Sequence, residues 1–172
     1  SMRLQFSSIN PFKNKNFFLF LNLIKTDNKI VNDDRFLGGI KTSRPVNVDG
    51  IYNFNGDISI GFPVRRVKGT VNLSSNGGYY RNKQLVNGVE NTSNTFSAGP
   101  DIRLDMSLGE KVNWSVGAGI NYNNTKYSLP MARDAKYISQ QYSTEFDWQL
   151  PKNIFIATDF SYRINNQLAE GF

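Results

Sequence analysis

Charged and apolar residues alternate in the stretch "DIRLDMS", which begins at Asp101. Asp101, Arg103 and Asp105 are spaced two apart, so in a β-strand they share one face. Two further carboxylates, Asp147 and Asp159, flank Pro151, where a tight turn can place them opposite each other across a hairpin. Facing carboxylates can raise the pKa of one member and serve as an acid–base pair. The sequence therefore offers carboxylate chemistry, or a charged patch that steers a substrate.

The composition argues against catalysis. The 172 residues include no Cys and no His, which excludes thiolate nucleophiles, disulfides and any mechanism that needs an imidazole base or ligand. Because no second catalytic signal accompanies the carboxylates, we expect that the chain is not an enzyme and holds no metal or cofactor. We expect Asp101, Arg103 and Asp105 to form a mutually neutralising ladder that also pairs with neighbouring strands.

The net charge of +6, from 20 basic and 14 acidic residues, raises the question of anionic partners. Arg65, Arg66 and Lys68 form the tightest basic cluster, which is small for a nucleic-acid footprint. We expect no nucleic-acid partner. The cluster suits either anionic lipid headgroups or a solvated turn.

The elements that must position these residues are β-strands. From Val46 to Phe62 every second residue is apolar or glycine and the residues between are almost all polar, which indicates a long strand with two unlike faces. The same period of two recurs in further stretches: Val67 to Leu73, Phe96 to Leu108, Val112 to Tyr122, Tyr142 to Leu150 and Ile154 to Ile164. Near the N-terminus the candidates are Leu4 to Ile9, Asn16 to Thr26 and, more weakly, Arg35 to Thr42. These patterns predict eight or nine strands and almost no helix.

The predicted connections alternate in length. The short ones are Pro11 to Lys15, Pro63 to Arg66, Gly109 to Lys111 and Pro151 to Asn153; the long ones are Asp27 to Asp34, Asn76 to Asn94 and Asn123 to Lys136. Such alternation places all short turns at one end of a sheet and all long loops at the other. We therefore predict an all-β chain: an antiparallel up-and-down meander of about eight strands, forming over residues 1–172 a single β-barrel domain or a fragment of a larger barrel.

Two kinds of barrel fit this pattern. A soluble, lipocalin-like barrel turns its apolar face inward and binds a small apolar ligand. A membrane barrel turns that face to lipid and needs strands of roughly 9–11 residues, longer than the usual 5–6. Strand length, short-turn and long-loop asymmetry, and aromatic residues near both strand ends favour the membrane barrel. The two differ in the exposure of the apolar side chains, which are exposed in a membrane barrel and buried in a soluble one. The test residues are Phe54, Ile58, Ile60, Leu104 and Ile120.

The membrane reading assigns each alternating residue to lipid or lumen. The lipid-facing set is Val48, Tyr52, Phe54, Ile58, Ile60, Phe62, Ile102, Leu104, Met106, Trp114, Val116, Ile120, Phe146, Trp148, Ile156 and Phe160. The lumen-facing set is Asp49, Asp57, Asp101, Arg103, Asp105, Glu145, Asp147, Asp159 and Arg163.

Several segments give the chain a resemblance to a known family. They are the strand start "NVDG", the "FPV" turn, the "LVNG" loop, the strand "KVNWSVGAGINYNNTKYS" and the hairpin "LPKNIFIATDFSYRI". In style and spacing, from about Phe12 to Phe172, the chain resembles the outer-membrane β-barrel of TonB-dependent receptor-like proteins. None of these segments is a sharp signature.

This resemblance implies a location in the outer membrane of Gram-negative bacteria. It implies a role in ligand or nutrient uptake by a larger barrel, of which this chain supplies part of the wall. The implied partners are outer-membrane lipid, the remainder of the barrel, a plug domain and a transported ligand that no residue here identifies. Near the C-terminus Ile164, Leu168 and Phe172 alternate as in a final barrel strand, but Asn166 and Glu170 break the pattern, so we expect a truncated strand.

Overall fold

The chain folds into one large β-sheet. The computed structural model describes residues 1–129 and 132–167. Its strands are β1 (Met2–Asn10), β2 (Lys15–Thr26), β3 (Lys29–Leu37), β4 (Ile40–Val48), β5 (Ile51–Val64), β6 (Gly69–Val86), β7 (Val89–Ser107), β8 (Val112–Tyr127), β9 (Ala135–Leu150) and β10 (Ile154–Gln167). Three single-turn 3-10 helices join them: η1 (Pro11–Lys13), η2 (Arg65–Val67) and η3 (Pro151–Asn153). No helix among the described residues is long and apolar enough to span a membrane.

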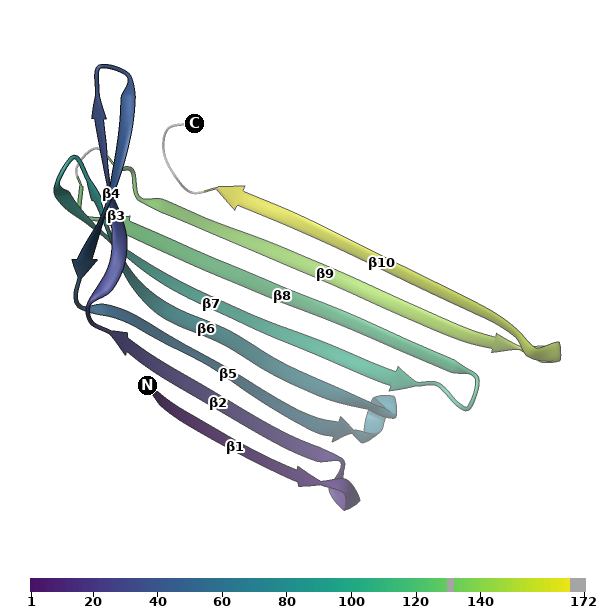
Figure 1. The fold of residues 1–172 in the computed structure, drawn as a ribbon. Coiled ribbons are helices and arrows are strands. Elements are labelled where there is room, and N and C mark those ends of the chain that lie inside the picture. The colour runs from purple at the N-terminus through teal and green to yellow at the C-terminus, as the bar shows by residue number, and fades with distance from the viewer. Residues whose placement is uncertain (130–131, 168–172) are drawn as a thin grey trace.

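Eight strands form an antiparallel meander in the order β1-β2-β5-β6-β7-β8-β9-β10. Figure 1 shows them as a single slanted layer with β1 at one edge and β10 at the other. Within the described residues these two strands pair on one side only, so the sheet is not closed. The predicted all-β, up-and-down architecture of about eight strands is confirmed, as a barrel-like segment with open edges.

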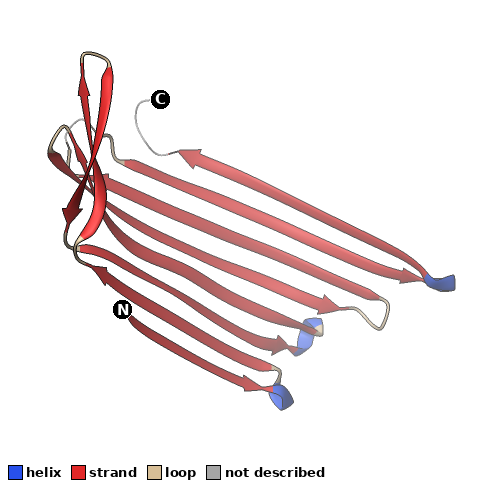
Figure 2. Cartoon of the chain, viewed as in Figure 1, coloured by secondary structure: helices blue, strands red, loops and turns tan. Residues whose placement is uncertain are grey.

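The four short connections lie at one end of the sheet, as the sequence predicted. They are η1, η2, the loop 108–111 and η3, and Figure 2 shows the three helical turns along that end. At the opposite end the chain makes larger excursions. Strands β3 and β4 form a hairpin inserted between β2 and β5, which stands up at that end (Figure 1). It joins the sheet through a short parallel pairing of β3 with the end of β6, at Asp33 and Asp34.

One predicted long loop is wrong. Most of the segment from Asn76 to Asn94 is strand, because β6 and β7 continue for 18 and 19 residues and meet at a two-residue turn, Asn87-Gly88. The φ angles there are +53° and +78°, as a tight hairpin turn requires. Polar residues on both faces of the outer half of this hairpin hid it. Even its buried residues Asn91 and Thr92 are polar, so no apolar alternation marks this part of the hairpin.

The strand predicted from Val46 to Phe62 is also wrong, since β4 ends at Val48 and β5 begins at Ile51. Side-chain hydrogen bonds fix the break: Asp49 Oδ1 accepts from the Asn28 backbone N at 2.6 Å. The predicted loop 27–34 is also wrong, because most of it is strand β3. The weak strand 35–42 contains the end of β3, the turn at Gly38-Gly39 and the start of β4, so it is the tip of the β3–β4 hairpin. The expectation for Leu168 and Phe172 lies outside the described residues.

The strands are staggered in one direction across the sheet. One row of directly paired residues runs through every strand of the meander: Ile9, Asn16, Gly61, Asn72, Arg103, Gly117, Ser143 and Ser161. The row starts one residue before the end of β1 but reaches β10 seven residues after its start. A progressive stagger of this kind is what a sheet needs to close into a barrel of tilted strands.

Candidate functional site

The two faces of the meander are chemically unlike, and the register aligns them from strand to strand. Directly paired residues in antiparallel strands share a face. On one face lie Tyr52, Phe54, Ile58, Ile60, Phe62, Ile102, Leu104, Met106, Trp114, Val116, Ile120, Phe146, Trp148, Ile156 and Phe160. On the other lie Asp57, Asp101, Arg103, Asp105, Glu145, Asp147, Asp159 and Arg163. We call these the apolar face and the polar face.

Nothing among the described residues covers the apolar face. Phe54 is 42% exposed and Ile120 48%, Ile58 and Ile60 are similarly open, and Leu104 is half-buried. The buried apolar side chains in the described part are Val48 and Ile51, each 7% exposed, and both lie beside the β3–β4 hairpin. Residues 1–129 and 132–167 therefore form no core beneath the main sheet.

Two predicted residues do not belong to these faces. Val48 is the last residue of β4 and is packed near the hairpin junction, so it does not lie on the apolar face. Asp49 lies between β4 and β5, where it bonds Asn28, so it does not lie on the polar face. Both assignments followed from the assumption that Val46 to Phe62 is one continuous strand.

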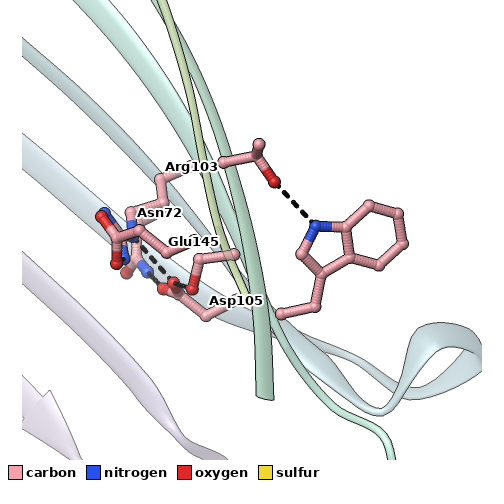
Figure 3. A network of polar contacts seen from close by, with 7 residues as sticks. Asn72, Arg103, Asp105 and Glu145 are labelled. Carbon is pink, nitrogen blue, oxygen red and sulfur yellow. Dashed lines mark hydrogen bonds and ion pairs between the residues drawn. The ribbon is translucent and has the colours of Figure 1, made fainter. Parts of the chain in front are cut away.

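The polar face carries an ion-pair network centred on Arg103 (Figure 3). Its guanidinium donates two parallel hydrogen bonds to Glu145, from Nη1 to Oε1 at 3.0 Å and from Nη2 to Oε2 at 2.7 Å. Arg103 Nε donates to Asp105 Oδ1 at 2.8 Å. Asp105 also accepts from Ser115 Oγ at 2.7 Å and from Asn72 Nδ2 at 2.9 Å. One cation thus joins two carboxylates, and the network spans β6 to β9.

Arg103 reaches from β7 to β9 across the part of β8 that contains Gly117. This glycine lies on β8 directly between Arg103 and Ser143 in the paired row. A Cβ built there would stand 2.7 Å from Ser143 Oγ, so Ser143 would have to move. No Arg103 atom lies within 4 Å of that Cβ position, so the glycine makes room for Ser143 directly, and a side chain longer than alanine is needed to reach the guanidinium.

The remaining predicted lumen charges stand apart from this network. Asp159 pairs with Glu145 and Asp147 with Ala157, so Asp147 and Asp159 are not opposite each other as the sequence analysis considered. Arg163 donates to Gln141 Oε1 at 2.8 Å. Of the expected ladder, the pairing of Arg103 with Asp105 and with a neighbouring strand is confirmed, whereas Asp101 makes no ion pair within the described residues.

Both tryptophans lie on the apolar face near the short-turn end. Trp114 pairs with Met106 and Phe146, and Trp148 pairs with Val112 and Ile156. Trp114 Nε1 donates to Thr144 Oγ1 at 2.8 Å, which satisfies its single donor on an otherwise apolar surface.

A second group of contacts lies at the far end of the sheet and was not predicted. We call the β3–β4 hairpin and the Asn87-Gly88 turn together the loop lobe. Asp33 is 1% exposed and accepts from Gly88 N at 2.9 Å and from Arg35 Nε at 2.8 Å. Asn87 Oδ1 accepts from Phe36 N at 2.8 Å. The Arg35 guanidinium and the Gly88 N–H hold the pKa of the Asp33 carboxyl below its ordinary value.

Sequence reasoning missed Asn72, Ser115 and Gly117 in the network. Each sits on a polar face that the period of two did identify, but the network depends on the register between strands that are far apart in sequence. The loop lobe gave a weaker signal, the Asn-Gly dipeptide, which is a hairpin-turn marker by itself.

Comparison with known proteins gives one finding. Residues 86–170 match the profile of a family described as "Protein of unknown function, DUF481". The chain is similar to that family over β7 to β10, which is just under half of its length. No curated protein and no solved structure matches the chain significantly.

Proposed function

We propose that the chain is part of the wall of an outer-membrane β-barrel that takes up a ligand across that membrane, as in a TonB-dependent receptor-like transporter. The observation that carries the proposal is the apolar face, which is continuous across all eight strands of the meander and uncovered among the described residues. A soluble monomer rarely leaves so large an apolar surface open to water. Hydrocarbon is the solvent that suits it.

The polar face supports the same proposal from the other side. Its charges and amides form hydrogen bonds along the sheet, as in the Arg103 network, so this face tolerates water. A barrel with lipid outside and a polar, wet interior has this pair of faces. The charged residues then line the path of the transported ligand and act by electrostatics, without a covalent step.

The open edges support a partial wall. Unpaired backbone N–H and C=O groups along β1 and β10 are costly in hydrocarbon, so each edge must pair with another strand. The remainder of a larger barrel supplies such strands.

The first experiment is folding with and without detergent. We expect the purified chain to be aggregated or unfolded in plain buffer and to become β-rich in micelles, as circular dichroism and size exclusion would show. Its electrophoretic mobility should change on heating. A monodisperse, folded monomer in plain buffer would instead place the apolar face inside, as in the lipocalin-like alternative.

A further inference from the structure

The short-turn end of the sheet carries an unusual concentration of positive charge. Seven of the 20 basic residues lie in or beside the four short turns, where Glu110 is the single acidic residue: Lys13, Lys15, Arg65, Arg66, Lys68, Lys111 and Lys152. All seven are exposed. We call them the basic rim.

The described residues do not neutralise the basic rim. The six ion pairs between described residues lie on the polar face or at the loop end of the sheet, and none involves a rim residue. Seven like charges along one end repel one another unless anions gather there. The rim therefore needs a negative counter-charge from outside the described part of the chain.

Exposed apolar residues lie in and next to the same short turns as the basic rim, and they indicate which kind of surface the rim contacts. Phe12, in η1, is 100% exposed, and Leu108 and Ile154 beside the turns are also open. Trp114 and Trp148 lie a few residues inside the turns on the apolar face. Tryptophans and exposed apolar groups next to cations are typical of a protein at the boundary between hydrocarbon and headgroups.

We propose that the basic rim binds the phosphates of anionic phospholipids, so that the short-turn end recruits these lipids around the barrel wall. This inference rests on the proposed membrane location, and it names the class of lipid that meets the short-turn end of the sheet. A cation close to an anionic membrane surface contributes attraction that salt screens, and Lys15 shares the face of Phe17, where it meets lipid directly.

The two tryptophans provide a local probe, because the chain contains no others. The full chain would be reconstituted in dioleoylphosphatidylcholine vesicles containing either brominated phosphatidylglycerol or brominated phosphatidylcholine. Bromine quenches tryptophan on contact, so the ratio of quenching gives the relative affinity for the anionic lipid. We expect an enrichment of phosphatidylglycerol of about fivefold, the preference that roughly one well-placed cation supplies.

Two matched variants test the residues. The triple variant Lys68→Gln, Lys111→Gln and Lys152→Gln removes three rim charges nearest the tryptophans, and the enrichment should fall to about twofold or less. The control Lys29→Gln, Arg44→Gln and Lys126→Gln removes three exposed charges from the opposite end and should leave it unchanged. If a variant does not fold, the wild-type chain in about 1 M salt, where screening acts within ~3 Å, should lose the preference.

The outcomes separate the two proposals. Equal quenching by both brominated lipids, or a preference that survives the rim substitutions and high salt, would overturn the lipid inference while leaving the membrane wall intact. Tryptophans that neither lipid quenches would overturn both.

Discussion

Arg103 holds two carboxylates of the polar face with one guanidinium. The Arg103–Glu145 pair is bidentate, which strengthens it, but both side chains are about 40% exposed (38% and 43%), so water screens much of the attraction. The pair therefore contributes modestly to the free energy of folding. Its main effect is geometric, because it connects β7 to β9 across β8.

Substitution of Glu145 tests this tie. Glu145→Gln removes the charge but keeps the shape, and we expect it to lower the free energy of unfolding by more than the loss of an unpaired charge on the same strand does. Unfolding by urea in micelles, followed by tryptophan fluorescence, would measure it. The matched control is Asp147→Asn, which removes a charge from the same strand and face where no ion pair is formed among the described residues. Equal losses from both variants would contradict the prediction.

Gly117 gives a second prediction at this scale. Gly117→Val places a branched side chain where even a Cβ would lie 2.7 Å from Ser143 Oγ. We expect the valine methyl groups, which reach beyond that Cβ, to crowd Arg103 as well as Ser143 and to destabilise the sheet by at least as much as Glu145→Gln. In the double variant Gly117→Val with Glu145→Gln the losses should be less than additive, because both remove the same interaction. Full additivity would show that Gly117 does not act through Arg103.

Titration of the Asp33 carboxyl should produce a pH-dependent change that is confined to the loop lobe. Because the folded-state pKa of Asp33 is lowered, its stabilising contribution is fully present above the unfolded pKa of about 3.9 and is lost as the pH falls through the lower, folded value. The amide resonance of Gly88, which donates to Asp33, should therefore titrate with a midpoint below pH 3.9. Asp33→Asn should abolish that titration. A midpoint at or above 3.9 would contradict the assignment.

At the scale of elements, the β6–β7 hairpin is the longest in the molecule, and its turn has two roles. Asn87 and Gly88 set the hairpin through their positive φ angles, and they also receive the β3–β4 hairpin through Phe36 and Asp33. The turn therefore joins two hairpins that are separated along the chain.

Two substitutions separate these roles. Gly88→Ala strains a φ of +78° and should cost about 1 kcal/mol, which thermal unfolding in micelles would register. Asn87→Gly keeps the turn conformation but removes the acceptor for Phe36 N, so it should leave the melting temperature nearly unchanged while protease cuts the β3–β4 hairpin faster. If Asn87→Gly lowered the melting temperature as much as Gly88→Ala, the two roles would not be separable.

Particular elements show what the sequence could and could not predict. The alternation in Phe96 to Leu108 correctly assigned Ile102 and Arg103 to opposite faces, because a period of two follows from strand geometry alone. The partner of Arg103 on β9 could not be predicted, since it depends on two registers in succession. The β4–β5 break was hidden because alternation happens to continue across Asp49 and Gly50.

For the whole molecule, the open edges govern association. We expect the isolated chain in micelles to pair edge to edge with other copies. Because it lacks Cys, a variant with Ser7→Cys on β1 and Ser161→Cys on β10 carries the only thiols. Oxidation should give cross-linked dimers and larger species on a non-reducing gel. A cross-linked monomer as the main product would instead mean that eight strands close on themselves.

The inserted β3–β4 hairpin also has a consequence for folding rate. Every other neighbouring pair in the meander is joined by seven residues or fewer, but β2 and β5 meet across residues 27–50. Closing a longer loop costs more chain entropy, and contacts distant in sequence slow folding. Early formation of the hairpin would shorten this loop and bring Thr26 close to Ile51. Pairing of β2 with β5 is therefore the step that should limit the rate of sheet assembly. Its rate should depend on how readily the inserted β3–β4 hairpin forms first.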